Sequence, residues 1–311
     1  MDSCGYADRR ICREGNKKIE RRDIFFLRHE LLKSIRSFFY KRNYIEVQTP
    51  HVVLSPGIDP HIEAVCVEGG YYLITSPELH MKRVVSMGCE KIFQITHAFR
   101  KEESGTYHNP EFCILEWYII NKEYTHLMKE VLDLVQWISQ DISYASSLSL
   151  NHVPRISIDD LFITHAGWKP SSSWDEMRFF SDFVDKIEPA LKEYEAVIIY
   201  DFPSPLASLS RIKDSDPLFC ERFELYLRGF EIANGFTELT DAEEYRTRFK
   251  EANRQRKTTG KKEYPVDESF LSDIQSGFPS CAGIALGVDR LLMAIIQASS
   301  IGEVMPFAQY R

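Results

Sequence analysis

The sequence lacks the features that mark exported, membrane-bound or zinc-binding proteins. Its seven cysteines (positions 4, 12, 66, 89, 113, 220 and 281) are odd in number and include no C-x-x-C pair, which argues against a zinc site and a disulfide framework. The N-terminus has no apolar segment of the signal-peptide type. The longest apolar stretch, CAGIALGVDRLLMAIIQ, is interrupted by Asp289 and Arg290 and is too short to span a bilayer. We therefore predict a reduced, cytoplasmic protein without a membrane partner.

Several familiar catalytic and nucleotide-binding patterns are also missing. No G-x-x-x-x-G-K-[ST] or G-x-G-x-x-G loop is present, and the nine histidines suggest no Ser-His-Asp arrangement. The net charge of −8 argues against a protein whose whole surface binds nucleic acid, although it leaves room for a local basic patch.

What the chain does have is enough apolar sequence for a substantial core. Of its 311 residues, 44% are hydrophobic and 13% aromatic. Helical periodicity covers residues 24 to 40, the segment after Ser76, residues 127 to 138 and residues 241 to 257. Strand patterns occupy residues 44 to 50, 71 to 75, 91 to 99, 112 to 120 and 196 to 203, and residues 221 to 239 form two strands with a bend at Gly229.

The order of these elements predicts the fold class. GIALGVDRLLMAIIQ is interpreted as a strand, a turn at Gly287 and a helix, whereas residues 140 to 195 show no clear pattern. Strands joined by hairpins and interrupted by helices predict an α+β fold with a largely antiparallel sheet flanked by helices. Residues 1–22 are expected to be a loosely ordered leader, and residues 23–311 one folded domain.

Two arginines stand where an anion could bind. Arg290 opens a helix just after Gly287, and a helix N-terminus with an arginine suits phosphate. Arg100 ends an alternating strand and faces a loop containing Gly105, where its planar guanidinium could bind a carboxylate or phosphate at two points. Ordinary ion pairs are the alternatives: with Asp289 or a neighbouring acid for Arg290, and with Glu102 or Glu103 for Arg100.

Glutamates lie within strongly apolar segments. Glu224, Glu231 and Glu238 occur in FELYLRGFEIANGFTEL, where an unpaired carboxylate is costly. Two of them could hold Mg²⁺ together with nucleotide phosphates, and the third could bind an ammonium group. Salt-bridged or rim glutamates are the alternative.

Two further acids belong to the same group of candidates. Glu78 stands at a strand-to-helix junction, where it could also simply stabilise the helix N-terminus. Glu116 and Tyr118 share one strand face, which suits recognition of an ammonium group or, alternatively, a solvent-exposed sheet edge.

One charge run remains. Residues 246 to 262, RTRFKEANRQRKTTGKK, contain eight basic residues and one acid. Most such runs are solvated faces, and docking of an acidic macromolecule is the alternative.

Taken in order, these segments resemble a known family. FFYKRNYIEVQTP, FQITHAFRKEESGTYHNPEFCILEWY and GIALGVDRLLM resemble motifs 1, 2 and 3 of class II aminoacyl-tRNA synthetases, and TSPELHMKR and GFEIANGFTELTD are similar to the lysyl branch. The resemblance covers residues 24 to 135 and 196 to 311. It implies the class II catalytic fold, with an antiparallel sheet flanked by helices and motif 1 at a dimer interface.

The resemblance also implies roles for individual residues. Arg100 would contact the substrate carboxylate and the ATP α-phosphate, and Arg290 the γ-phosphate. The remaining ATP contacts would come from Lys101, Glu102, Asn109, Glu231, Ile232 and Gly287. Glu224 and Glu231 would bind Mg²⁺. The amino-acid substrate would be held by Ser76, Glu78, Tyr118 and Glu238, with Glu116 as a support for Tyr118.

Two features are similar to a subgroup of the lysyl branch. Motif 1 begins near residue 24, which leaves no room before it for an anticodon-binding domain, and Ser76 stands where lysyl-tRNA synthetases usually have alanine. Both are similar to the elongation factor P–(R)-β-lysine ligases. The implied activity is ATP-dependent activation of (R)-β-lysine or lysine, then transfer to a lysine ε-amine of elongation factor P, with tRNA an improbable partner.

Alternatives remain open from the sequence. The first is a minimal lysyl-tRNA synthetase-like enzyme that acts on tRNA or a free amine, and the second a non-catalytic regulatory relative. The sequence also departs from the ligase pattern at Leu206, where a polar residue is expected, and between residues 140 and 195. These departures bear on the amino-acid preference and on contacts with the protein partner.

Overall fold

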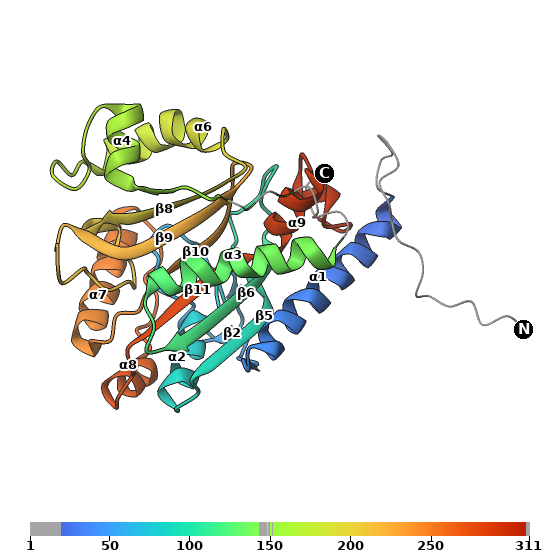
Figure 1. Ribbon diagram of the computed structural model, residues 1–311. Coiled ribbons are helices and arrows are strands. Elements are labelled where there is room, and N and C mark those ends of the chain that lie inside the picture. Colours follow the sequence, from blue (N-terminus) through green and yellow to red (C-terminus); the bar gives the residue numbers. More distant parts are fainter. Residues whose placement is uncertain (1–19, 143–147, 149, 151, 309–311) are drawn as a thin grey trace, which may run out of the picture.

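The computed structural model describes residues 20–142, 148, 150 and 152–308 (Figure 1). Its first half contains α1 (Arg21–Lys41), β1 (Ile45–Glu46), β2 (Val52–Val53), β3 (Cys66–Val67), β4 (Tyr71–Leu73), α2 (Glu78–Ser86), β5 (Lys91–Phe99), β6 (Glu111–Ile120) and α3 (Tyr124–Asp141). The second half contains β7 (Arg155–Ser157), α4 (Ile158–Ala166), α5 (Glu176–Asp182), a π-helix (Phe183–Ile187), α6 (Glu188–Leu191), β8 (Ala196–Pro203), β9 (Phe219–Leu227), β10 (Phe230–Thr237), α7 (Ala242–Thr258), α8 (Glu268–Gln275), β11 (Cys281–Gly287) and α9 (Val288–Ile296). Short 3₁₀ turns lie at Ser204–Leu206 and Ile301–Glu303.

One eight-stranded sheet organises the molecule. Its order is β1-β5-β6-β11-β10-β9-β8-β7, and a second sheet, β2-β4-β3, has three antiparallel strands. All pairs from β5 to β8 are antiparallel, and only the edge pairs β1–β5 and β7–β8 are parallel. The predicted α+β class with a largely antiparallel sheet is therefore confirmed.

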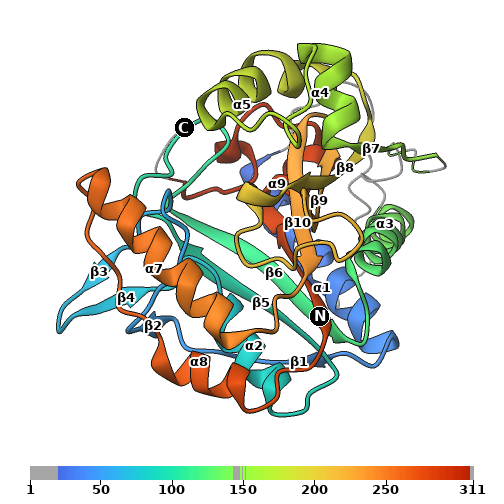
Figure 2. The same cartoon turned by 90° about the vertical axis from the view of Figure 1, so that its left-hand side faces the viewer.

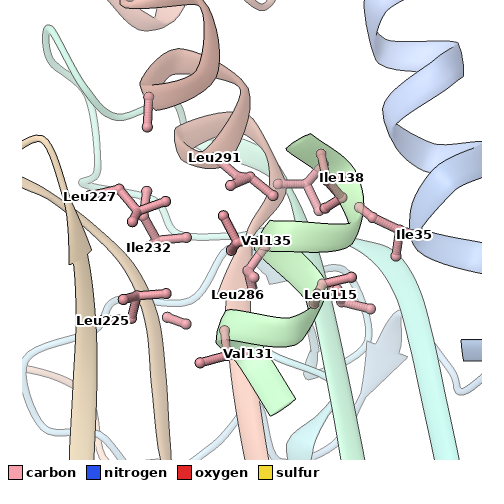
Figure 3. Close-up of a cluster of buried hydrophobic side chains, with 14 of the residues drawn as sticks. Ile35, Leu115, Val131, Val135, Ile138, Leu225, Leu227, Ile232, Leu286 and Leu291 are labelled. Carbon is pink, nitrogen blue, oxygen red and sulfur yellow. The ribbon is translucent and has the colours of Figure 1, made fainter. Parts of the chain in front are cut away.

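One face of the large sheet is covered by α1, α3 and α9. In α1 the buried residues recur at helical spacing from Ile24 to Phe39, so one stripe of the helix meets the core. Figure 3 shows Val131, Val135 and Ile138 of α3 among leucines of the sheet and Leu291 of α9. This large apolar cluster fixes the positions of β6, β10 and β11, which together carry the cavity described below.

The opposite face has two separate apolar clusters. One joins α2, α7 and α8 to the β5–β6–β11 end of the sheet, and the other joins α4, α5 and α6 to β8 and β9. Figure 2 shows α7 and α8 at the lower left and α4 and α5 at the top. The middle of this face, over β6, β11 and β10, is therefore the part that neither helical cluster covers.

The sequence-based boundaries were accurate for the long elements and poor for short ones. The predicted strand over residues 44 to 50 was wrong in length, because only Ile45–Glu46 pairs with a neighbour. Strand β3 and helix α8 were not predicted, and residues 140 to 195, which showed no clear pattern, contain β7 and α4 to α6. Helix α1 begins at Arg21, two residues inside the predicted leader. The rest of that leader, residues 1–19, lies outside the described residues.

No helix among the described residues combines the length and the apolar character that crossing a membrane requires.

The basic run from 246 to 262 is largely neutralised within the fold. Arg246 pairs with Glu268, Arg248 with Glu244, and Arg254 with Glu251. Arg256 continues the buried stripe of α7 and is only 1% exposed. These pairs favour the solvated-face interpretation, and docking of an acidic partner on this run stays an untested alternative.

Arg256 ties α7 to the loop before β3. Its guanidinium donates to the carbonyls of Lys262 (2.7 Å) and Ile62 (2.9 Å) and to the carboxylate of Glu63 (2.7 Å), and it stacks on the ring of Tyr264. Removal of one partner from a buried ion pair leaves the other charge without compensation.

We expect Arg256→Ala to lower the free energy of unfolding by about 3 kcal/mol, because Glu63 and two carbonyls lose their donor. Thermal denaturation followed by circular dichroism measures the change. The matched control is Arg254→Ala, whose side chain is 69% exposed and pairs with a glutamate at the surface. Equal midpoints for the two variants would contradict this account.

Candidate active site

A cavity of about 340 Å³ opens over the middle of the sheet face that the helices leave uncovered. Its floor is formed by alternate residues of three neighbouring strands. On β11 these residues are Gly283, Ala285 and Gly287, which lie between Glu116 and Tyr118 of β6 and Asn234 and Phe236 of β10. Since the central strand carries no side chain larger than a methyl group on this face, the sheet itself is hollowed.

Gly283 makes the closest approach in the site. A Cβ atom at this position would collide with Glu238 Oε1 and with the ring of Tyr118. Both side chains therefore lean over the backbone of β11, into space that only glycine leaves open.

A β-bulge in β10 turns several polar side chains toward the cavity. Glu231 is opposite Tyr226 and Ala233 opposite Leu225, so Ile232 is an extra residue in the ladder. Glu231 and Asn234 are three residues apart and would point to opposite faces of a regular strand, but with the bulge both line the cavity.

The first group of charged residues, here called the arginine cluster, consists of Arg100, Glu103, His108, Glu231 and Arg290. Arg100 donates to Glu103 at 3.0 Å and lies over the ring of Phe112. Arg290 contacts His108 Nε2 and lies 3.4 Å from Glu231 Oε2. Burial and the charge of Arg290 lower the pKa of His108, which keeps its imidazole neutral at neutral pH. Two guanidinium groups and a neutral imidazole can receive the oxygens of a polyphosphate.

The second group, here called the carboxylate cluster, consists of Glu78, Glu116 and Glu238 with their partners Ser76, Tyr118 and Lys82. Ser76 Oγ bonds to Glu116 Oε1 and also accepts from the backbone N–H of Glu78 (3.1 Å). Tyr118 donates to Glu116 Oε2 at 3.2 Å. Burial, and secondly the charge of Glu78, raise the pKa of Glu116 to about 8, so at neutral pH this group is largely a neutral acid.

Glu78 and Glu238 share one buried partner. Lys82 Nζ lies 2.7 Å from Glu78 Oε1 and 2.6 Å from Glu238 Oε2. Burial raises the pKa of Glu238 to about 8, and Lys82 acts in the opposite direction. Burial alone would lower the pKa of Lys82, but the charges of Glu238 and Glu78 outweigh it and hold that pKa well above its usual value.

The two clusters lie at different positions along the same strands. Tyr118 is opposite Gly283, whereas Ile114 is opposite Gly287, which directly precedes α9 and Arg290. Four residues of strand separate these two pairs, roughly 13 Å. The cavity can therefore hold one molecule with ammonium groups at one end and an anion at the other.

Glu224 and Glu231 form the candidate metal site. Within the described part of the chain no three acidic, histidine or cysteine side chains gather as metal ligands. Burial, and secondly repulsion from the charge of Glu231, raise the pKa of Glu224 to about 7. Arg222 (2.8 Å) and Tyr226 (3.0 Å) donate to Glu224. Two carboxylates supplemented by phosphate oxygens fit the preference of Mg²⁺.

Most residues predicted from the sequence meet in this cavity. It is lined by Ser76, Glu78, Arg100, Asn109, Tyr118, Glu231, Ile232, Gly287 and Arg290. Four others do not line it: Lys101 and Glu102 are exposed in the β5–β6 loop, and Glu224 and Glu238 are buried one layer behind the cavity wall. The functional roles assigned to all thirteen stay predictions.

The structure decides between the binding-site and the ordinary ion-pair or surface interpretations for some of these residues. Arg290 forms its ion pair with Glu231 (3.4 Å) and lines the cavity as well. It does not pair with Asp289, which instead bonds to Arg28 of α1 and to the backbone N–H of Cys113 (2.7 Å). Arg100 does form the ordinary ion pair with Glu103 and lines the cavity as well. Glu116 and Tyr118 are buried, so the solvent-exposed sheet edge is wrong.

Sequence reasoning missed five residues of the site. They are Lys82, His108, Arg222, Asn234 and Gly283. Lys82 had a signal, since it stands four residues after Glu78 on a predicted helix. Gly283 and Asn234 depend on cross-strand register, which a single sequence does not reveal. Leu206, the departure noted above, does not line the cavity, although its carbonyl accepts from Arg222 at 2.9 Å.

Comparison with known proteins finds a matching family and several relatives of known name. Residues 10–311 match the family described as tRNA synthetases class II (D, K and N). The chain is 39% identical over 305 residues to the elongation factor P–(R)-β-lysine ligase of Mannheimia succiniciproducens, covering 91% of this chain and 94% of that protein. The proteins of the same name from Proteus mirabilis (38%, 91% and 94%) and Salmonella typhi (37%, 90% and 93%) are similarly related.

Glu116 makes the stability of the fold depend on pH. Its pKa is raised in the folded state, so its contribution is complete below the unfolded-state pKa of about 4.5 and is lost as the pH rises toward 8. Glu116→Gln cannot ionise. We therefore expect its stability relative to the wild type to be greater at about pH 8.5 than at about pH 5, by on the order of 1–3 kcal/mol.

Thermal denaturation of both proteins at the two pH values measures this difference. Glu30→Gln, on the exposed side of α1, is the control for a glutamate in solvent. If the two substitutions have the same pH dependence, Glu116 is not a neutral acid in the folded protein.

Proposed function

The chain belongs to the family of class II tRNA synthetases (D, K and N), and on this premise we propose that it is an ATP-dependent ligase which joins (R)-β-lysine or lysine to elongation factor P. The related proteins that bear this ligase name match about nine tenths of the chain. The observation that carries the proposal is the cavity itself, where the carboxylate cluster and the arginine cluster face one another along β6 and β11.

The cavity fits a molecule that is cationic at one end and anionic at the other. The carboxylate cluster would receive the amino groups of the substrate, with Glu78 and Tyr118 at the wall and Glu238 behind it. The carboxylate of the substrate would then extend toward Arg100. Ser76 would fix the positions of Glu116 and Glu78, because its hydroxyl bonds to the Glu116 carboxyl group and accepts a hydrogen bond from the Glu78 backbone N–H.

The first reaction step would be activation of the carboxylate. A carboxylate is a poor acylating agent, so one of its oxygens attacks the α-phosphorus of ATP, the bond to the β-phosphate oxygen breaks, and pyrophosphate leaves. Negative charge on the α-phosphoryl oxygens would be stabilised by Arg100, and Arg290 with His108 would hold the far phosphates. The aminoacyl-adenylate is the product.

Mg²⁺ would bind to Glu224 and Glu231 and neutralise phosphate charge. Both carboxylates lie on the cavity-facing side of β9 and β10, opposite or next to Asn234 and Tyr226. Arg222, which donates to Glu224 and to Asn234, orients the buried carboxylate before any cation arrives.

The second step would transfer the acyl group to a protein amine. A deprotonated lysine ε-amine of elongation factor P attacks the acyl carbon, AMP leaves, and a stable amide results. The five described cysteines are all free, which is consistent with a cytoplasmic location, where thiols are kept reduced.

The first test is the intact mass of elongation factor P after incubation with the protein, Mg-ATP and either lysine isomer. An increase of one lysyl unit, larger with (R)-β-lysine, is expected. Arg100→Ala should lower adenylate formation by at least about 10²-fold, because the α-phosphoryl charge loses its guanidinium. The control is Arg254→Ala, the same substitution at an exposed surface arginine, and this variant should retain full activity.

The alternatives give different results in this experiment. Charging of lysine tRNA without modification of the factor would establish a minimal synthetase. Amino-acid or ATP binding without any acyl transfer would establish a regulatory protein. Normal pyrophosphate release by Arg100→Ala would remove that arginine from the mechanism.

The proposal includes a homodimer formed through motif 1. Ile45 (56% exposed), Val52 (48%) and Leu54 (61%) leave apolar surface on β1 and β2 and the loop that follows, which a second copy could bury. A dimer interface at motif 1 is also what the family resemblance implies.

We expect light scattering to give twice the mass of one chain. The substitution Ile45→Glu combined with Leu54→Glu should shift the protein to monomer, because two charges would enter the interface. Met177→Glu, at an even more exposed apolar position on α5, should leave the mass unchanged. A wild-type monomer, or a double variant that stays dimeric, would contradict this interface.

A further inference from the structure

Lys82 is a lysine with no exposed side-chain surface. It lies in α2, and its four-carbon stem passes into the apolar cluster that joins this helix to α7 and α8. A buried ammonium group without compensation would lose its proton or destabilise the fold. Its contacts therefore show what keeps it charged.

Two carboxylates compensate the ammonium group. Nζ lies 2.7 Å from Glu78 Oε1 and 2.6 Å from Glu238 Oε2, and 3.3 Å from the hydroxyl of Tyr245. It also stands over the rings of Phe236 and Tyr245. The titratable and charged groups that face it from the surrounding elements are Glu78 on its own helix, Glu116 and Tyr118 on β6, Glu238 after β10, Tyr245 on α7 and Cys281 on β11.

Glu238 is only half satisfied by this pair. Lys82 approaches Oε2, yet neither buried oxygen of Glu238 accepts a hydrogen bond of good geometry. Oε1 lies against the backbone of Gly283, beside the ring of Tyr118, both of which line the cavity. Lys82 thus contacts Oε2 of Glu238, and the other oxygen, Oε1, lies against the floor of the cavity at Gly283.

We propose that Lys82 is a positioning residue for substrate selection, which holds Glu78 and Glu238 in place for a substrate with two ammonium groups and supplies the positive charge between them. The inference rests on the proposed function, since it concerns the amino-acid end of the same cavity. Lys82 supplies a positive charge that contacts both Glu78 and Glu238, the two carboxyl groups assigned to the amino groups of the substrate.

The physical reason is the cost of buried charge. Burial favours the protonated form of Glu238, and Lys82 acts against it; without Lys82 this carboxyl group would bind an ammonium group less well, because a neutral carboxylic acid is a poorer partner than a carboxylate. Because Lys82 contacts both carboxyl groups from α2, it also fixes where the free oxygens of Glu78 and Glu238 point.

Lys82→Met tests the inference, because methionine fills the same channel without charge. We expect the KM for lysine in lysine-dependent exchange of pyrophosphate into ATP to rise at least about tenfold near neutral pH, while the KM for ATP stays within about twofold. The lysine KM should recover as the pH rises, because the buried carboxyl group of Glu238, which has lost its counter-charge, ionises again. A purely structural role would lower the active fraction and leave both KM values and their pH dependence unchanged.

Selectivity gives a second readout. Norleucine has the length of lysine but no side-chain ammonium, and the wild type should discriminate strongly against it. In Lys82→Met the ratio of kcat/KM for lysine to that for norleucine should fall at least about tenfold. The matched control is Arg83→Met, which removes the same charge from the next residue of α2, where the guanidinium forms a partly exposed pair with Asp273.

The outcomes separate this inference from the proposed function. If the wild type activates lysine and Lys82→Met has an unchanged lysine KM and selectivity, the inference is wrong and the ligase proposal stands. If the wild type activates no amino acid but binds lysine in calorimetry, and this binding is lost in Lys82→Met, the inference stands and the ligase proposal is wrong. A wild type that neither binds nor activates lysine overturns both.

A second variant covers the case in which Lys82→Met fails to fold. Lys82→Gln keeps hydrogen-bond donors for Glu78 and Glu238 and removes only the charge. The same rise in lysine KM and the same recovery at high pH are expected, and wild-type values in a folded Lys82→Gln protein would overturn the inference.

Discussion

A cavity in the middle of a sheet requires a central strand that carries almost no side chain on one face. β11 meets this requirement with Gly283, Ala285 and Gly287, while its other face packs Ala282, Ile284 and Leu286 into the large core. The same strand is thus fully buried on one side and hollow on the other. The polar side chains of β6 and β10 lean over it from both sides, so the composition of the site depends on this steric constraint.

The second constraint is electrostatic. The cavity gathers carboxylates at one end and guanidinium groups at the other, and each group is restrained by an internal counter-charge. Lys82 holds two glutamates, Glu103 holds Arg100, and Glu231 faces Arg290. Such pairs contribute little net stability once desolvation is counted. Their value lies in fixed orientation, because a site whose dipoles and charges are already in place needs no rearrangement when charge develops.

The sequence was sufficient for the fold class and for most of the site, and the limits have physical causes. Long elements such as α1, α3 and β6 carry a clear period, whereas β1 to β4 have two or three residues each and too few positions to show one. The motif order brought together Arg100, Glu231 and Arg290 correctly. It did not separate Glu224 and Glu238, which lie behind the wall, from Glu78 and Tyr118, which line it, because depth depends on packing. The bulge at Ile232 and the counter-ion Lys82 likewise become visible only with cross-strand register and contacts.

The bulge in β10 limits which insertions and deletions this segment can accept during evolution. Because Ile232 is one residue too many for the ladder, the length of the segment between Glu231 and Asn234 decides which face each side chain occupies. Deletion of a single residue there would turn Glu231 away from the cavity while leaving every remaining residue chemically intact. Substitutions within this stretch alter one side chain each, whereas a one-residue insertion or deletion rearranges the whole wall. The spacing of this segment therefore determines the cavity wall as much as the identity of its residues does.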